Sequence, residues 1–252
     1  GSYYGALLSR AGHEVWFQLR ADHEVVARDG VQVVSDRGGE FHARPKCIRV
    51  PDSAGVVVLV LMGLKTTANG EFPRLVPGWV GPQTAVLTLQ NGLAARIAAD
   101  ELGRKRAVVG FVNFGADRIG DGTIMLGNRG AVALGEWDGK TTARLVELCQ
   151  LLGDFEPDAV ATPDIWSFIW GKLAYAALLF AEATATSGIA ATLDRPELLP
   201  LWHALAGEAI ATARAEGIEP TGFNGFEPIA FGPRAKVADS AASIRSIADF
   251  YR

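Results

Sequence analysis

Cysteine is scarce in this chain, which has only Cys47 and Cys149 among its 252 residues. Two cysteines this far apart match neither the spacing of a zinc site nor the disulfide framework of a small secreted domain. Such scarcity is typical of proteins kept in a reducing compartment, so we expect a cytoplasmic protein. The histidines also lack metal-ligand spacing, and the sequence predicts no metal site. These histidines are His13, His23, His42 and His203.

The chain also lacks an excess of positive charge, and its sequence has no long apolar run. The chain has 24 Lys and Arg against 28 Asp and Glu, a formal net charge of −4, so a basic surface for nucleic acid is not expected. No apolar run reaches the roughly 20 residues that cross a bilayer, and we expect no membrane partner. With 49% hydrophobic residues, the chain is long enough for a sizeable core and for two domains.

The first twenty residues form the pattern around which the other observations are organised. Small and apolar residues at 5–11 follow one face of a short helix, which Gly12 ends. Residues 13–19 then have the pattern of a strand, and Arg20 stands at its end. A helix leading into a strand is the second half of a nucleotide-binding βαβ unit. An arginine where an acidic residue would bind an unmodified ribose favours NADP over NAD.

The Gly-x-Gly-x-x-Gly turn that should precede this helix is not in the sequence. In one interpretation, Gly1 is the third glycine of that turn, so that Gly1 and Ser2 bind the cofactor and the first strand is absent from the sequence. In the other interpretation, Gly1 and Ser2 are a cloning remnant. We prefer the first because of the strands that follow.

Three apolar segments predict a doubly wound parallel sheet of Rossmann type. Residues 55–61, 84–89 and 107–114 are apolar without alternation, as in parallel strands covered on both faces. Ligands of such folds bind outside the carboxyl ends of the strands. The candidate cofactor residues there are Lys65, Asn91 and the backbone around Gly115 and Ala116. Each alone is ambiguous, since a strand-end lysine is usually solvated and Asn-Gly is usually a turn.

The other segments complete a two-domain prediction. We expect strands at 31–35, 41–50 and 155–161, a helix at 141–152, and an antiparallel hairpin that joins 122–126 to 131–135 through a turn at 127–130. From Thr162 the pattern is helical, with long helices at 163–185, 198–216 and 237–251. The chain is therefore predicted to be α/β: a Rossmann-like NADP-binding domain at 1–161, followed by an all-α domain at 162–252 for the substrate or for oligomerisation.

Lys172 is the candidate catalytic residue of the helical domain. It lies beside the apolar stripe of its helix, and no other charged residue follows before Glu182. Desolvation lowers the pKa of a lysine, and a lowered pKa suits a general acid near neutral pH. Spacing alone favours a lysine whose ammonium group reaches solvent at the edge of the domain.

The order of these landmarks resembles the ketopantoate reductase (2-dehydropantoate 2-reductase) family from residue 1 to about residue 188. The shared landmarks are Gly1 to Gly12, His13-Glu14-Val15, Arg20, Leu64-Lys65-Thr66, Leu89-Gln90-Asn91-Gly92, Gly110 to Ala116, Gly122, Gly127 and Trp170-Gly171-Lys172-Leu173. No single motif is specific, but the ordered set is.

The resemblance implies an NADPH-dependent oxidoreductase of pantothenate biosynthesis that reduces a small 2-keto acid or related carbonyl. Arg20 would bind the 2′-phosphate, and Lys65, Asn91 and Ala116 would line the cofactor site. Lys172 would donate a proton to the ketone oxygen as hydride arrives. The resemblance also implies that the family's first strand and its C-terminal region, with a catalytic Glu, lie outside this sequence. It leaves a homodimer open.

One departure from the family keeps a second hypothesis open. The family's lysine is followed, four and eight residues on, by asparagines that hold the substrate, and Ala176 and Phe180 stand there in this chain. Apolar side chains cannot make those hydrogen bonds. The alternative is therefore a non-catalytic NADP-binding or regulatory protein. A related NADP-dependent hydroxyacid dehydrogenase is a third hypothesis.

Overall fold

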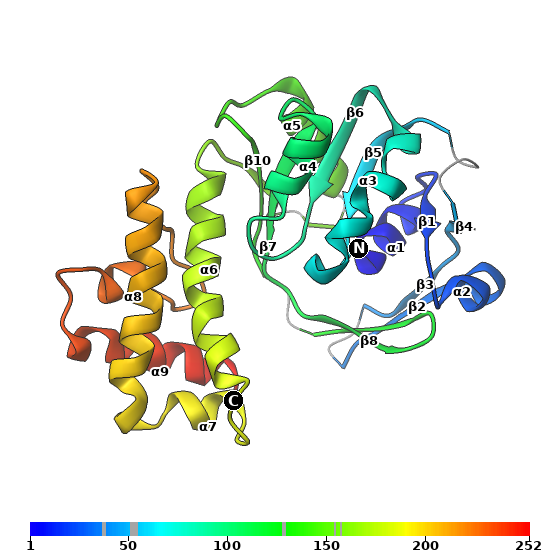
Figure 1. Ribbon diagram of the computed structural model, residues 1–252. Helices are drawn as coiled ribbons and strands as arrows, with labels where there is room; N and C mark the ends of the chain where they lie inside the picture. Colours follow the sequence, from blue (N-terminus) through cyan, green and yellow to red (C-terminus); the bar gives the residue numbers. More distant parts are fainter. Residues whose placement is uncertain (37–38, 51–54, 128–129, 154, 157) are drawn as a thin grey trace. The chain divides into compact units, whose positions relative to one another are not determined.

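The computed structural model describes residues 1–36, 39–50, 55–127, 130–153, 155–156 and 158–252. The chain forms two compact units, residues 1–165 and residues 166–252. The first unit contains sheets and helices, whereas the named elements of the second are helices (Figure 1).

The main sheet of the first unit has the strand order β11-β10-β7-β6-β5. Its parallel part is β5 (Val57–Met62), β6 (Val80–Thr88) and β7 (Ala107–Val112), the three strands that the apolar segments predict. Next to β7, β10 (Val132–Glu136) runs antiparallel, and β11 (Val160–Ala161) is parallel to β10. The carboxyl ends of the three parallel strands therefore lie at one edge of the sheet, as predicted.

Helices cover both faces of this sheet. Helices α1 (Ser2–Arg10) and α5 (Ala143–Gly153) pack on one face, and α3 (Phe72–Leu75) and α4 (Ala95–Leu102) pack on the other. Ala85, Val86 and Leu87 of β6 point alternately into the two cores and are almost fully buried. Burial on both faces is why these strands are continuously apolar, and it confirms the doubly wound prediction.

A second sheet packs on the opposite side of α1. Its order is β3-β2-β9-β8, from β3 (Phe41–Ala43), β2 (Val31–Val34), β9 (Thr123–Leu126) and β8 (Ala116–Gly120). Ala6 of α1 belongs to the core of this sheet, whereas Tyr4 belongs to the core of the main sheet. The first predicted helix is thus held between two sheets.

The prediction of one strand over residues 41–50 is wrong. The segment contains β3 and a separate strand, β4 (Lys46–Ile48), which pairs in parallel with β1 (Trp16–Gln18) in a sheet of their own. Pro45 lies between β3 and β4. Proline has no N–H to donate and fixes φ, so it interrupts a strand at this point. Helix α2 (His23–Asp29) follows β1.

The predicted hairpin is also wrong. β9 pairs with β8 and β2, whereas β10 pairs with β7 and β11, so the two strands belong to different sheets. Every residue of β10 is buried, which suits a place inside the main sheet, but β9 is only partly buried. The predicted turn at 127–130 includes residues 128–129, which lie outside the described residues.

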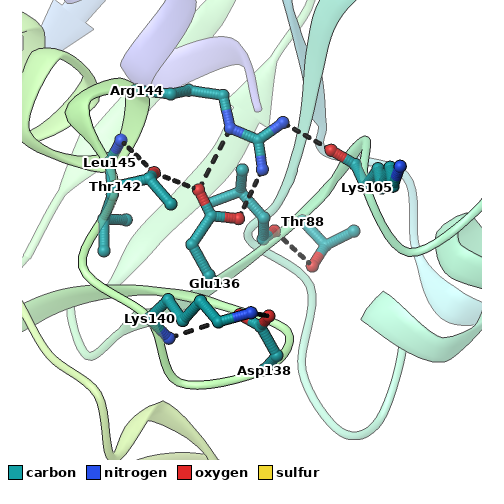
Figure 2. A network of polar contacts seen from close by, with 9 residues as sticks. Thr88, Lys105, Glu136, Asp138, Lys140, Thr142, Arg144 and Leu145 are labelled. Atoms are coloured by element: carbon teal, nitrogen blue, oxygen red, sulfur yellow. Dashed lines mark hydrogen bonds and ion pairs between the residues drawn. The ribbon is translucent and has the colours of Figure 1, made fainter.

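A polar network fastens α5 to β10 (Figure 2). Glu136 is buried, and Arg144 of α5 forms an ion pair with it in addition to an Nε–H donated to Oε1 at 3.1 Å. The Thr142 hydroxyl donates to the same oxygen at 2.6 Å, and Arg144 also donates to the Lys105 carbonyl at 2.6 Å. Glu136 pairs with Val108 at the beginning of β7, away from the strand ends where the cofactor residues are predicted.

The second unit contains the long helices α6 (Ile165–Glu182), α8 (Leu199–Ala215) and α9 (Ala241–Phe250), with the short α7 (Ile189–Leu193) between α6 and α8. Their buried side chains make a single core, which contains Trp202, Phe226 and Ile247. Among the described residues, the 3-10 helices are η2 (Thr66–Glu71), η3 (Pro77–Trp79), η4 (Pro196–Leu198), η5 (Pro228–Phe231) and η6 (Val237–Ser240). The helix predicted at 237–251 therefore begins as η6 and continues as α9.

Candidate functional site

Helix α1 begins in direct contact with the end of β5. A Cβ atom on Gly1 would lie 2.9 Å from the Gly63 Cα, and one on Gly63 would lie 2.3 Å from the Gly1 Cα, so neither position accepts a side chain. The first intrahelical hydrogen bond runs from the Gly5 N–H to the Gly1 carbonyl at 2.9 Å. The N–H groups ahead of it point out of the beginning of the helix and carry partial positive charge. Such a helix beginning suits a phosphate.

Lys65 lies close to this helix beginning. The positive charge of Lys65 acts on the nitrogen atom of Gly1, which is buried at the start of the helix. Lys65 itself is exposed and immediately precedes η2. A cationic side chain is therefore available near the start of α1.

A glutamine that the sequence argument overlooked joins two of the strand ends. The Gln90 Nε2 donates to the Leu64 carbonyl at 2.6 Å and to the Asn69 Oδ1 at 2.7 Å, and Asn69 is buried. These bonds tie the segment after β6, which carries Asn91, to the segment after β5, which carries Lys65. The available signal was position, because Gln90 directly precedes Asn91 at the end of a predicted strand.

The end of β7 packs against α1. The Phe114 ring lies 5.4 Å from the Tyr3 ring and 5.2 Å from the Tyr4 ring, measured between centroids. Gly115 follows, and its carbonyl accepts a hydrogen bond from the Gly127 N–H at 2.9 Å. Ala116 then begins β8. The backbone around Gly115 therefore leaves the sheet next to the first turn of α1.

Arg20 lies two residues beyond the end of β1, where it is exposed. The ion pair with Arg74 holds the pKa of Glu71 below its usual range, and the charge of Arg20 adds to this effect. Because Glu71 ends η2, Arg20 lies near the segment that begins after Lys65.

An ion pair holds the segment after Arg20 against β8. Arg118 of β8 donates from Nε to the Asp22 Oδ2 at 2.7 Å and from Nη2 to Oδ1 at 2.6 Å. This pairing keeps the pKa of Asp22 below its usual range. Arg20 and Ala116 are thus each two residues from a partner in the same bidentate ion pair.

The predicted cofactor residues all belong to the first unit, where these contacts connect the segments that carry them. They are Gly1, Ser2, Arg20, Lys65, Asn91, Gly115 and Ala116. The arrangement offers a helix beginning and two cations, which can bind the phosphates of a dinucleotide.

Lys172 belongs to α6 of the second unit. Its side chain is partly buried, and burial lowers the pKa of its ammonium group to about 8. The preceding Gly171 packs tightly: a Cβ there would lie 1.9 Å from the Thr221 carbonyl oxygen. The Thr221 N–H also donates to the Ser167 carbonyl at 3.0 Å. The backbone that carries Lys172 is therefore fixed against the 221 segment.

Neither a metal site nor a membrane-spanning helix is found among the residues that the structure describes. No three His, Cys, Asp or Glu side chains gather as they would around a metal ion. Within the same residues, no helix is both long and apolar enough to cross a bilayer.

Comparison with family models decides the family. The model for ketopantoate reductase PanE/ApbA matches residues 1–139, which is more than half of the chain and includes every predicted cofactor residue. The chain belongs to the ketopantoate reductase family. The predicted resemblance is confirmed, and so is the fold class of a Rossmann-like domain followed by helices.

Two curated relatives of this family member are 2-dehydropantoate 2-reductases. A 2-dehydropantoate 2-reductase of Nostoc sp. is 35% identical over 140 residues, which are 54% of this chain and 43% of that protein. The enzyme of the same name from Archaeoglobus fulgidus is 26% identical over 172 residues, 68% of this chain and 56% of that protein. The matches thus span only about half the length of these curated relatives.

Solved structures give the same fold. The crystal structure of 2-dehydropantoate 2-reductase from Geobacter metallireducens GS-15 matches with a TM-score of 0.84 and 30% identity, over 97% of this chain and 79% of that one. A D-mandelate dehydrogenase in complex with NADH matches with a TM-score of 0.77 and 18% identity, over 99% of this chain and 76% of that one. At that identity, the second match supports the fold alone.

Proposed function

We propose that this member of an oxidoreductase family is an NADPH-dependent reductase of a small 2-oxo acid or related carbonyl, with Lys172 as the general acid. The observation that supports the proposal best is that the ends of β5 and β7 pack against the start of α1, while Gln90 ties the end of β6 to the end of β5. A site of this kind suits a phosphorylated dinucleotide.

The residues of the first unit fit such a cofactor. Gly1 and Gly63 leave no room for a side chain where α1 meets β5, and a backbone this close to the sheet lets a pyrophosphate approach the N–H groups of the first turn. In the proposal, Gly1 and Ser2 bind the pyrophosphate, Arg20 binds the 2′-phosphate, and the other cofactor residues line the site. They are Lys65, Asn91, Gly115 and Ala116. When bound, the cofactor supplies the hydride.

In the proposal, Lys172 carries out the protein's part of the chemistry. Reduction of a ketone builds negative charge on its oxygen, and a nearby ammonium group stabilises that charge and then protonates it. The pKa of about 8 leaves Lys172 mostly protonated at neutral pH yet able to release its proton. Burial is the physical cause of this lowered pKa.

The direct test is the consumption of NADPH, followed by its absorbance, in the presence of a panel of 2-oxo acids. The proposal expects turnover with at least one acid, and faster turnover with NADPH than with NADH. Absence of turnover throughout the panel, with NADPH bound tightly, would favour the alternative of a non-catalytic NADP-binding or regulatory protein. Ala176 and Phe180 favour that alternative, because they offer no hydrogen bonds to a substrate.

A related NADP-dependent hydroxyacid dehydrogenase is the third hypothesis, and the substrate profile alone distinguishes it. The cytoplasmic location, a role in pantothenate biosynthesis and a homodimer remain predictions. Fractionation and the mass of the protein in solution test the first and the last of these.

A further inference from the structure

Three side chains follow one another along one face of α6. Lys172, Ala176 and Phe180 are four residues apart, and such residues are neighbours on a helix surface. The opposite side of the helix contributes Ala174 and Leu178 to the core, where both are fully buried. The face that carries Lys172 therefore continues toward the end of the helix as an alanine and then a phenylalanine.

Ala176 and Phe180 form a small apolar surface beside Lys172, which we call the shelf. Long side chains on a helix lean toward its beginning, so the ring of Phe180 extends back toward the turn that carries Ala176. Ala176 is small and leaves room between the ammonium group and the ring. Phe180 is 69% exposed, so its ring surface is accessible to a ligand.

The shelf has no side-chain hydrogen-bonding group. Alanine and phenylalanine can neither donate nor accept, and the next charged residue along the helix is Glu182. Glu182 is buried and, ten residues beyond Lys172, lies about 80° from it around the helix. A substrate hydroxyl group placed on the shelf would lose water without a replacement, whereas an apolar group would gain from burial against the ring.

We propose that the side group of the substrate is apolar and that Ala176 and Phe180 are the residues that select it. The polar end of the 2-oxo acid faces Lys172, and its side group lies over Ala176 against Phe180. This inference rests on the proposed function, in which Lys172 meets the substrate, and it adds the substrate class.

The test compares two acids that differ by one hydroxyl group: 2-dehydropantoate and its analogue without the hydroxyl, 3,3-dimethyl-2-oxobutanoate. For the full chain with NADPH, we expect kcat/KM to be about 10- to 100-fold higher for the analogue. The dissociation constants of both acids, measured calorimetrically with NADP⁺ present, should rank in the same order. The double variant Ala176→Asn/Phe180→Asn should reverse the preference, and Ile229→Asn, at a 78% exposed site elsewhere in the unit, should leave it unchanged.

The outcomes separate this inference from the proposed function. Turnover of both acids with an equal or opposite preference overturns the apolar selection and leaves the reductase standing. A lack of turnover with any acid contradicts the reductase, and the calorimetric ranking then decides the selection alone. A double variant that keeps the original preference also overturns the role of Ala176 and Phe180.

Discussion

Arg20 carries the preference for a phosphorylated ribose in this account. An exposed guanidinium near the end of η2 can make charge-assisted hydrogen bonds to a 2′-phosphate. We expect Arg20→Asp to weaken NADPH binding by about 10- to 100-fold, which corresponds to roughly 1.5–3 kcal/mol, and to change NADH binding little. Fluorescence titration of both cofactors measures the effect.

The matched control for this variant is Arg245→Asp, which makes the same charge change at an exposed position of α9 in the other unit. It should leave both affinities unchanged. Equal losses of NADPH and NADH affinity in Arg20→Asp would show that Arg20 does not distinguish the two cofactors.

Substitution of Gln90 tests whether the link between the ends of β5 and β6 supports cofactor binding. Replacement by leucine removes both hydrogen bonds and leaves the buried oxygen of Asn69 without its donor, at a cost of about 1–3 kcal/mol in unfolding free energy. We expect the Gln90→Leu variant to bind NADPH about tenfold more weakly, because the segments of Lys65 and Asn91 are no longer tied together. Thermal unfolding and cofactor titration measure the two effects.

Gln83→Leu, at an exposed position of β6, is the control and should change neither quantity. If Gln90→Leu lowered stability but bound NADPH normally, Gln90 would be a structural residue alone.

Candidate residues with chemically distinctive side chains could be proposed from the sequence, whereas residues that act through contacts in the fold could not. Lys65 and Asn91 follow apolar strands, so their place at the sheet edge follows from strand direction. Asn69 gave no such signal: its role depends on Gln90, 21 residues away along the chain, and only folding brings the two together.

Among the secondary-structure elements, α1 and β5 make the contact on which the proposed cofactor site depends. Gly63→Ala places a Cβ 2.3 Å from the Gly1 Cα, so α1 must shift. We expect a loss of about 1–3 kcal/mol in unfolding free energy, typical of overpacking, and a loss of NADPH affinity of at least tenfold. Chemical denaturation and cofactor titration provide the two values.

Gly70→Ala is the matched control, because a Cβ there meets nothing within 4 Å. It should behave like the unmodified protein. Normal NADPH affinity in a folded Gly63→Ala protein would contradict the placement of the cofactor at the start of α1.

Substitutions in the network around Glu136 should change the stability of the protein and leave cofactor binding unchanged. Arg144→Met removes the partner of a buried carboxylate, and we expect a loss of about 3 kcal/mol in unfolding free energy. Lys140→Ala, which breaks the exposed pair with Asp138, should change the unfolding free energy little. Neither change should alter the KM for NADPH, since the network lies at the other end of β7. A raised KM in Arg144→Met would overturn that separation.

The strands of the main sheet were predictable because burial on both faces makes them continuously apolar. The hairpin was not predictable, because strand pairing depends on competition among all strands. β9 and β10 are neighbours along the chain, yet β10 is buried enough to pair with β7 inside the main sheet. The split of residues 41–50 could have been predicted from Pro45.

At the scale of the whole molecule, the proposed work is divided between the two units. The cofactor residues belong to residues 1–165 and Lys172 belongs to residues 166–252. Substitutions in the first unit should therefore change cofactor affinity, whereas substitution of Lys172 should change the rate and leave that affinity intact. Sequence periodicity indicated this division, because the pattern becomes wholly helical from Thr162.

The pH dependence of kcat/KM, with NADPH saturating and an active 2-oxo acid as the varied substrate, tests the central claim most directly. Lys172 must be protonated to act as the acid, and its pKa is about 8. We predict constant kcat/KM below that pH and a tenfold fall per unit above it. Lys172→Ala should lose 10²- to 10⁴-fold in kcat/KM, with unchanged NADPH affinity and without this pH limb. An undiminished rate in Lys172→Ala, with the same pH limb, would contradict the account.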